Sequence, residues 1–154
     1  MSAAVDLFDG MWTKLKSTPA ITALMTNGTW LEWRGGLLQR FELNAAMCPL
    51  ISLGPAGDWA FPCDHHDGAP VVPFVCEIAV DSRDARVGMR LLLAVVNALI
   101  AEARGGNRFG VYTLDKLTFT NAQSALYHAK ENASPLWTST FNIQARFRVG
   151  TDLD

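Results

Sequence analysis

The residues best suited to chemistry are concentrated between Asp58 and Pro73, in the sequence DWAFPCDHHDGAPVVP. This stretch contains one of the three cysteines, two of the three histidines and three aspartates. Thiolate, imidazole and carboxylate groups are all zinc ligands, and a tetrahedral site needs about four ligands that converge on one point. The composition therefore raises the hypothesis of a small metal-binding domain or a metal-dependent enzyme that uses Cys63, His65 and His66.

The spacing within this cluster argues against a complete zinc site. In an extended segment His65 and His66 point to opposite sides, so that only Cys63 and His65 can share an ion. No C-x-x-C, H-x-x-x-H or H-E-x-x-H motif supplies a second pair of ligands. The other cysteine and histidine ligands in the sequence are Cys48, Cys76 and His128. The alternative is a polar loop, framed by proline and glycine, that is rich in such residues because it faces water.

Two other arrangements have the composition of a catalytic or phosphate-binding site. Cys63 paired with His65 or His128 would be a nucleophile and its base, but the sequence shows neither an orienting third group nor a setting that lowers the thiol pKa. The glycine-rich GGNRFG at 105–110 follows a predicted helix, whereas phosphate-binding loops follow a strand and open a helix. We interpret it as a helix end and a turn.

Charged pairs at two places have ordinary structural explanations. Asp81 and Asp84 flank the predicted start of a helix, where capping and the helix dipole account for carboxylates. Arg146 and Arg148 lie two residues apart on one face of a predicted strand. They can bind phosphate, or they can belong to a solvated strand face, and two arginines do not distinguish these alternatives.

Composition limits the classes of function. The sequence is 49% hydrophobic and 18% charged, compared with about 25% charged in ordinary globular domains. This predicts surplus apolar surface that needs a partner. The net charge of -2 excludes a positive field over the whole molecule. The apolar run 91–101 is shorter than the ~20 residues of a membrane span, and the N-terminal residues lack signal-peptide features. We therefore expect no membrane association and a reducing environment without disulfides.

Hydrophobic periodicity predicts the elements that carry these residues. Helices are predicted at 4–17, 18–27 and 83–104. Strands are predicted at 29–33, 49–54, 73–80, 111–120 and 137–149. This order predicts a single α+β domain, residues 1–154, in which a mostly antiparallel sheet of about four or five strands has helices packed on one face. We expect projecting loops at about 55–72 and 121–136.

Three of these elements carry specific expectations. Strand 111–120 needs an irregularity at Asp115, because Leu114 and Leu117 cannot otherwise share a face. Segment 137–149 alternates throughout, so it predicts a strand with one buried and one wet face. Helix 83–104 is apolar on nearly all sides between Leu91 and Ala101, which predicts burial all round, under the N-terminal helices or another subunit.

The layout resembles a family of virus proteins. The segments that carry the resemblance are STPAITALM, CPLISLG, FVCEIAVDSRDARVGMRLLLAVVNALI and the closing alternating strand. Together with the N-terminal helix and the long loop, they are similar in order and hydrophobic pattern to tail terminators and related neck, head–tail joining and tail-completion proteins of tailed bacteriophages. The resemblance spans residues 5–149.

The resemblance implies a structural virion protein without a catalytic residue, cofactor or metal. Such proteins form a ring, typically a hexamer, that caps the tail tube and joins it to the head connector. The implied partners are further copies of the chain, the tail tube protein, a head–tail connector or neck protein, and genomic DNA that passes through the channel without sequence-specific binding. The implied location is the tail or neck of a virion assembled in the host cytoplasm.

In that context we expect the 55–72 loop to contact a neighbouring subunit or a stacked ring. The candidate interface residues are Trp59, Phe61, His65, His66, Arg146 and Arg148. Histidine has an unperturbed pKa of about 6.5, so protonation of the two histidines would tune such a contact.

Overall fold

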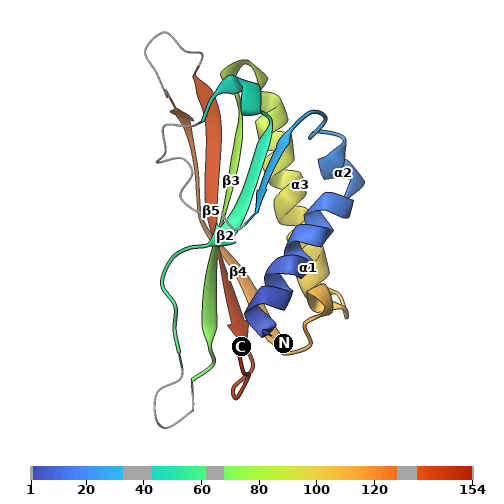
Figure 1. The fold of residues 1–154 in the computed structure, drawn as a ribbon, viewed down its shortest axis with the longest axis vertical. Helices are drawn as coiled ribbons and strands as arrows, with labels where there is room; N and C mark the ends of the chain where they lie inside the picture. Colours follow the sequence, from blue (N-terminus) through green and yellow to red (C-terminus); the bar gives the residue numbers. More distant parts are fainter. Residues whose placement is uncertain (1, 33–42, 62–67, 128–134, 154) are drawn as a thin grey trace.

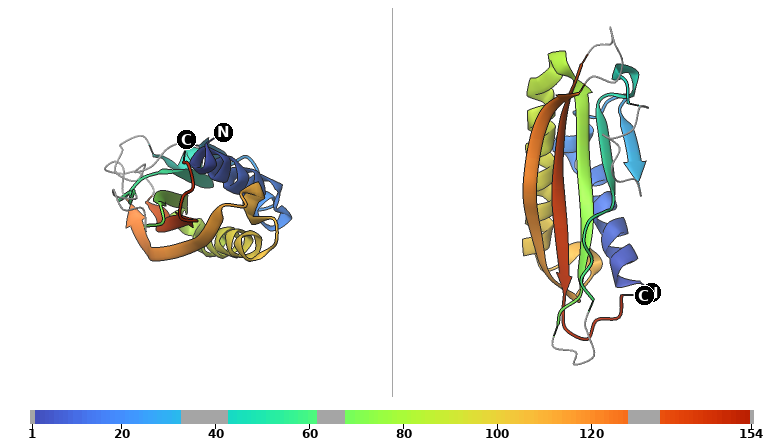
Figure 2. Two further views of the ribbon diagram at one scale, coloured as in Figure 1. Left: turned by 90° about the horizontal axis from the view of Figure 1, so that it is seen from below. Right: turned by 90° about the vertical axis from the view of Figure 1, so that its left-hand side faces the viewer.

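The computed structural model describes residues 2–32, 43–61, 68–127 and 135–153. The helices are α1 (Ala3–Ser17), α2 (Pro19–Thr22) and α3 (Ala85–Arg104). The strands are β1 (Thr29–Glu32), β2 (Leu50–Pro55), β3 (Val71–Asp81), β4 (Leu114–Tyr127) and β5 (Leu136–Phe147). Three short 3-10 turns precede β2, α3 and β4, respectively: η2 (Ala45–Met47), η3 (Ser82–Asp84) and η4 (Arg108–Gly110). The predicted α+β class is confirmed, because the helices form a layer on one side of the sheet (Figures 1 and 2).

The sheet has the strand order β1-β2-β3-β5-β4 (Figure 2). Strand β1 pairs with β2 in parallel, and the remaining neighbours are antiparallel. The two central strands, β3 and β5, are paired from Val71–Arg146 to Asp81–Leu136. The predicted mostly antiparallel sheet is therefore confirmed.

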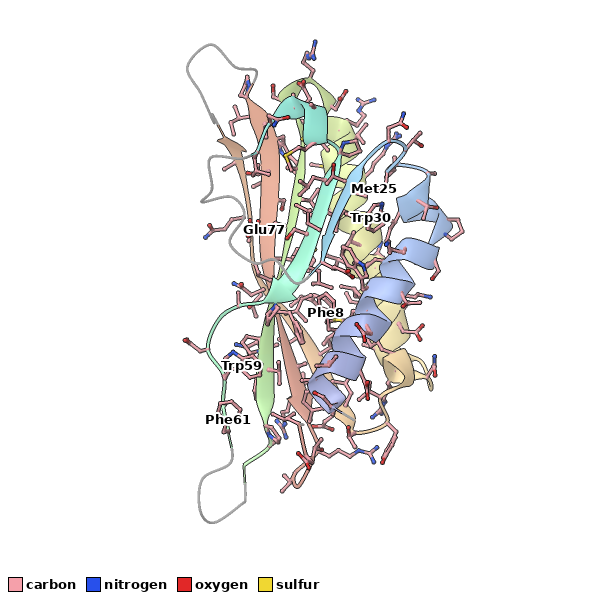
Figure 3. The ribbon with its side chains drawn as sticks, viewed as in Figure 1. Phe8, Met25, Trp30, Trp59, Phe61 and Glu77 are labelled. Carbon is pink, nitrogen blue, oxygen red and sulfur yellow. The ribbon has the colours of Figure 1, made fainter. Side chains whose placement is uncertain are left out.

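The main core lies between the sheet and the helices. Alternation in β3 directs Phe74, Cys76 and Ile78 toward this core, where each is at most 1% exposed. Phe8 lies between α1 and the sheet (Figure 3), with its ring centroid 6.3 Å from that of Phe74. The opposite face of β3 is also buried, since Glu77 is only 2% exposed. Strand β3 is thus buried on both faces. Its two edges are paired with β2 and β5.

The first helix begins and ends where its sequence provides the caps. The Ser2 hydroxyl accepts a hydrogen bond from the Val5 amide at 3.2 Å, which satisfies one of the free N–H groups of the first turn. The Ser2 hydroxyl also donates to the carbonyl of Leu153 at 2.6 Å. The two ends of the described chain therefore lie side by side (Figure 1). None of the described helices is long and apolar enough to cross a bilayer.

The N-terminal helices do not bury the third helix on all sides, and the alternative of cover by another subunit stays a prediction. In α3 the side chains of Leu91, Val95 and Leu99 are fully buried, whereas Met89 and Leu93 are 59% and 54% exposed. The physical reason is that the helix layer is only one helix thick: α3 contacts the sheet on one side and α1 on one flank. The outer side of α3 has no cover within the described chain.

Strand β4 is longer than predicted. The expected irregularity at Asp115 is confirmed by a register shift between Leu114 and Lys116. A second shift follows Thr120, and pairing with β5 then continues to Tyr127. The predicted projecting loop at 121–136 is therefore wrong over 121–127. These residues do not alternate in polarity, and they form a strand because the edge of β5 is available to pair with them.

Other predicted ends shift by a few residues. The second helix is limited to Pro19–Thr22 and is followed by turns, with Asn27 in the left-handed region at φ 58°. Strand β3 begins at Val71 rather than 73. Strand β5 ends at Phe147, and Val149, predicted on its buried face, is 58% exposed.

Candidate assembly surface

The described residues of the connection between β2 and β3, 56–61 and 68–70, continue past the end of β2 along the edge of β3 (Figure 1). We call this connection the arm. The Ala60 amide donates to the Val71 carbonyl at 3.1 Å, and the Val71 amide donates back to Ala60 at 2.9 Å. The Ala56 amide also donates to the Pro73 carbonyl at 3.3 Å. These bonds hold the described first part of the arm against β3 as an irregular extension of the sheet.

Two aromatic side chains stand on the arm in contact with each other. The rings of Trp59 and Phe61 are stacked, with centroids 5.8 Å apart and planes at 14° (Figure 3). They remain 45% and 62% exposed. An exposed aromatic pair presents a large apolar area whose two rings already hold each other in place, which is typical of contact surfaces. The structure thus places these two predicted interface residues together.

The other predicted residues of the arm, Cys63, His65 and His66, lie outside the described residues, as does His128. The two remaining candidate metal ligands are described. Among the described residues, no group of three or more potential ligands is close enough to hold a metal ion.

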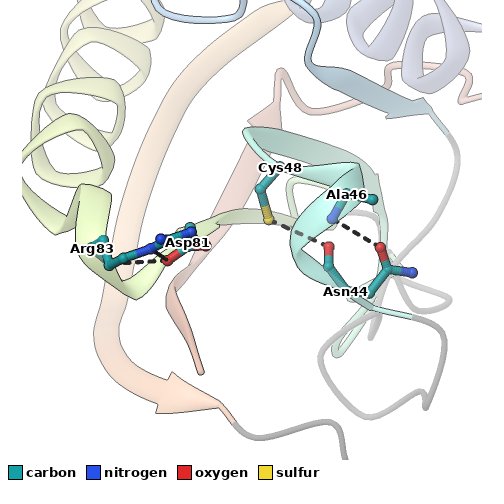
Figure 4. A network of polar contacts seen from close by, with 5 residues as sticks. All are labelled: Asn44, Ala46, Cys48, Asp81 and Arg83. Carbon is teal, nitrogen blue, oxygen red and sulfur yellow. Dashed lines mark hydrogen bonds and ion pairs between the residues drawn. The ribbon is translucent and has the colours of Figure 1, made fainter. Parts of the chain in front are cut away.

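The thiols of Cys48 and Cys76 are poorly suited to metal binding or nucleophilic attack, because both reactions use the thiolate. Burial raises the pKa of Cys48 to about 11, and the nearby carboxylates Asp81 and Asp84 add to the shift. Complete burial raises the pKa of Cys76 further, with a contribution from Glu77. Figure 4 shows the Cys48 sulfur directed to the carbonyl of Asn44, at 3.7 Å.

The two predicted interface arginines differ in their surroundings. The Nε of Arg146 lies 3.3 Å from the Oδ2 of Asp115, at the bulge of β4, and both side chains are about half exposed. Arg148 follows β5 and is exposed, and its backbone amide donates to the carbonyl of Thr113. Asp115 thus partly neutralises Arg146, and phosphate binding by the two arginines stays a prediction.

Sequence reasoning missed an apolar groove on the helix layer. It lies between α3 and the α1–α2 corner, has a volume of about 550 Å³, and is lined mainly by alkyl groups. Its lining residues include Leu93, Ala94, Ala98 and Ala101 of α3 and Ala20 of α2. The alanine side chains end at Cβ, which leaves the hollow. The sequence signal for this groove is the helical spacing of Ala94, Ala98 and Ala101 next to Leu93. The exposure of Leu93 is visible only in the structure.

Basic residues stand beside the apolar lining of this groove. Lys14 and Arg90 line it together with the neutral polar residues Thr18 and Asn97. Lys14 is paired with Glu102 across α1 and α3, with the Nζ and Oε2 atoms 3.4 Å apart. Arg90 is exposed. The groove therefore combines an apolar floor with one exposed cation, Arg90, at its border, while Glu102 partly neutralises Lys14.

Comparisons with known proteins give a fold likeness. No family model matches the chain, and no curated protein sequence matches it. Among solved structures, the chain is similar to a chain from the virion of a native gene transfer agent particle, with a TM-score of 0.59 and 20% sequence identity. The similarity covers 89% of this chain and 90% of the other. At this identity the match shows that the two chains share a fold across nearly their whole lengths.

Proposed function

We propose that this protein is a structural subunit of a phage-like virion, and that it forms the ring that terminates the tail. The observation that carries the proposal is the shared fold with a chain of a gene transfer agent virion over 89% of this chain. The role that the similar chain has within its own particle is not assigned to this protein. The terminator role is supported by the element order and hydrophobic pattern that resemble tail terminators.

The distribution of apolar surface supports self-assembly. Large apolar side chains are exposed on the arm, at Trp59 and Phe61, and on the outer side of α3, at Met89 and Leu93. Exposed apolar groups that cluster at distinct places mark interaction sites. Two different apolar surfaces on one chain suit a head-to-tail contact, which closes into a ring when the rotation between subunits allows it.

In this role the ring caps the tail tube, stops its growth and offers its other side to a head–tail connector or neck protein. DNA passes through the channel without sequence-specific binding. The proposed function requires no catalytic group or cofactor, and the protein acts through shape and contact surfaces alone. Its location is the tail or neck of the virion.

The test is assembly and tube capping with purified protein. Light scattering and electron microscopy are expected to show a defined ring, and labelled protein is expected to bind only the ends of tail tubes from the same virus. Tubes grown in its presence are expected to stop lengthening. A protein that stays monomeric and binds neither the ends nor the sides of tubes would contradict the proposal. Binding along the sides would indicate another tail component.

A further inference from the structure

The aromatic pair on the arm and the apolar groove on the helix layer are complementary in character. Each is apolar at its centre: Trp59 and Phe61 on the arm, and Leu93 with the α3 alanines in the groove. The groove has a volume of about 550 Å³ and is a shallow hollow that is widely open to solvent. A stacked aromatic pair is a group of suitable size and polarity to enter it.

The charges of the two surfaces are opposite. The described arm residues, 56–61 and 68–70, contain one aspartate and no lysine or arginine. Among the described arm residues, Asp58 is exposed directly beside Trp59. By contrast, the groove is lined by the exposed Arg90 and by Lys14, which is paired with Glu102. Opposite potentials favour encounter and fix the orientation of a contact. A cation beside an aromatic ring adds further attraction.

The arm cannot reach the groove of its own chain. In Figure 1 the described part of the arm runs down one side of the molecule, and the helices α1, α2 and α3, whose residues line the groove, lie on the other. The view at right angles in Figure 2 shows the sheet in front of the helices. The described arm residues thus lie at the edge of β3, in line with the sheet, whereas the groove lies between α3 and the α1–α2 corner in the helix layer. A contact between them must join two copies of the chain.

We propose that the arm of one copy docks in the groove of a second copy, with Trp59 and Phe61 against Leu93 and the α3 alanines, and Asp58 beside Arg90. This inference rests on the proposed function, because it supplies the contact that a self-assembling subunit needs. The contact is heterologous, since each copy offers its arm to one neighbour and its groove to the other. Repetition of the contact builds the ring.

The decisive experiment mixes two variants that are each defective in one half of the contact. The arm variant carries Trp59→Ser and Phe61→Ser, and the groove variant carries Leu93→Glu, which places a negative charge where the acidic arm would dock. All three positions are exposed, so both variants are expected to fold, as checked by thermal unfolding. Leu126→Glu on β4, where the leucine is 61% exposed, is the matched control that is expected to assemble normally.

Sedimentation velocity measures the outcome. Each variant alone is expected to be monomeric, with self-association weakened at least about 30-fold, as for interface hot spots. The equimolar mixture is expected to form dimers and nothing larger, because the groove variant keeps its arm and the arm variant keeps its groove. A mixture that stays monomeric would overturn the inference, and so would rings formed by either variant alone. If wild-type protein forms rings in that case, the proposed function stands without this contact.

Charge reversal gives a second measure. Asp58→Lys and Arg90→Glu are each expected to weaken self-association by up to about fivefold, as for a partly exposed ion pair. The two changes combined in one chain are expected to recover most of the loss, because the pair is then restored in reverse. Additive losses in the double variant would contradict the pairing of these two residues.

Discussion

Phe141 in the centre of β5 and Phe61 on the arm are the same residue type in opposite environments. Phe141 is 1% exposed and lies 6.0 Å from the ring of Phe119, whereas Phe61 is 62% exposed and is stacked on Trp59. Removing an aromatic side chain from water stabilises whatever encloses it. Within one chain Phe141 contributes this stabilisation to folding, while the area that Phe61 still exposes is available only to a partner. Folding and assembly therefore depend on different regions.

The largest expected effect is on the folding side of this comparison. Phe141→Ala removes a ring from the closed core and leaves a cavity, which is expected to lower the free energy of unfolding by about 3–5 kcal/mol. Denaturant unfolding followed by circular dichroism measures it. A loss below about 1 kcal/mol would mean that the core at β5 is loosely packed, contrary to its burial.

The fit of α3 on the sheet gives the next largest effect. A Cβ added at Gly88 would lie 2.7 Å from the Cζ3 of Trp137 and 2.8 Å from the Cγ2 of Val80. Although alanine is the better helix former, Gly88→Ala is expected to lower the free energy of unfolding by about 1–3 kcal/mol through overpacking. Gly106→Ala is the control, because no atom lies within 4 Å of its added Cβ. Equal stability of both variants would show that α3 moves freely on the sheet.

The end of β3 provides a smaller, pH-dependent contribution. Asp81 accepts hydrogen bonds from the side chain and from the backbone amide of Arg83, at 3.0–3.1 Å (Figure 4). These bonds, the side-chain bonds most of all, lower the pKa of Asp81 below the usual 3.8. A depressed carboxyl pKa stabilises the fold above the unfolded-state pKa, and this stabilisation is lost as the pH falls through the folded-state value.

Asp81→Asn is therefore expected to flatten the fall in melting temperature below pH 4, with little effect of the same change at exposed Asp58. Because Arg83 is 82% exposed, high salt is expected to reduce the difference. An acid dependence that is unchanged in Asp81→Asn would show that this carboxylate is not stabilised in the folded state.

The smallest expected effect on stability is at the arm. Phe61→Ala removes a ring that is mostly in water, so the free energy of unfolding is expected to change by less than about 0.5 kcal/mol. The same denaturant titration as for Phe141→Ala measures it. A loss of unfolding free energy comparable to that of Phe141→Ala would contradict the contrast between Phe61 and Phe141, because the arm would then be part of the folding core.

Much of the fold is predictable because its signals are local. The spacing of Val5, Phe8, Trp12 and Leu15 predicts α1, although Val5 is 42% exposed in the structure. Two-residue alternation predicts β3 and β5. The bulge at Asp115 is predictable from two leucines that must share a face. The candidate site is only partly predictable. The aromatic residues of the arm are recognisable in the sequence, but the groove depends on how α1, α2 and α3 pack together.

The sequence by itself determined which segments are helices and strands and which of their faces are apolar, because side-chain periodicity is a property of neighbouring residues. Only the tertiary structure decided that 121–127 extend β4 and that α3 leaves Leu93 exposed beside a groove. It also decided that the arm lies along the edge of β3, while the groove lies among the helices that cover one face of the sheet. These features depend on pairing and packing between residues far apart in the chain, and no local pattern records them.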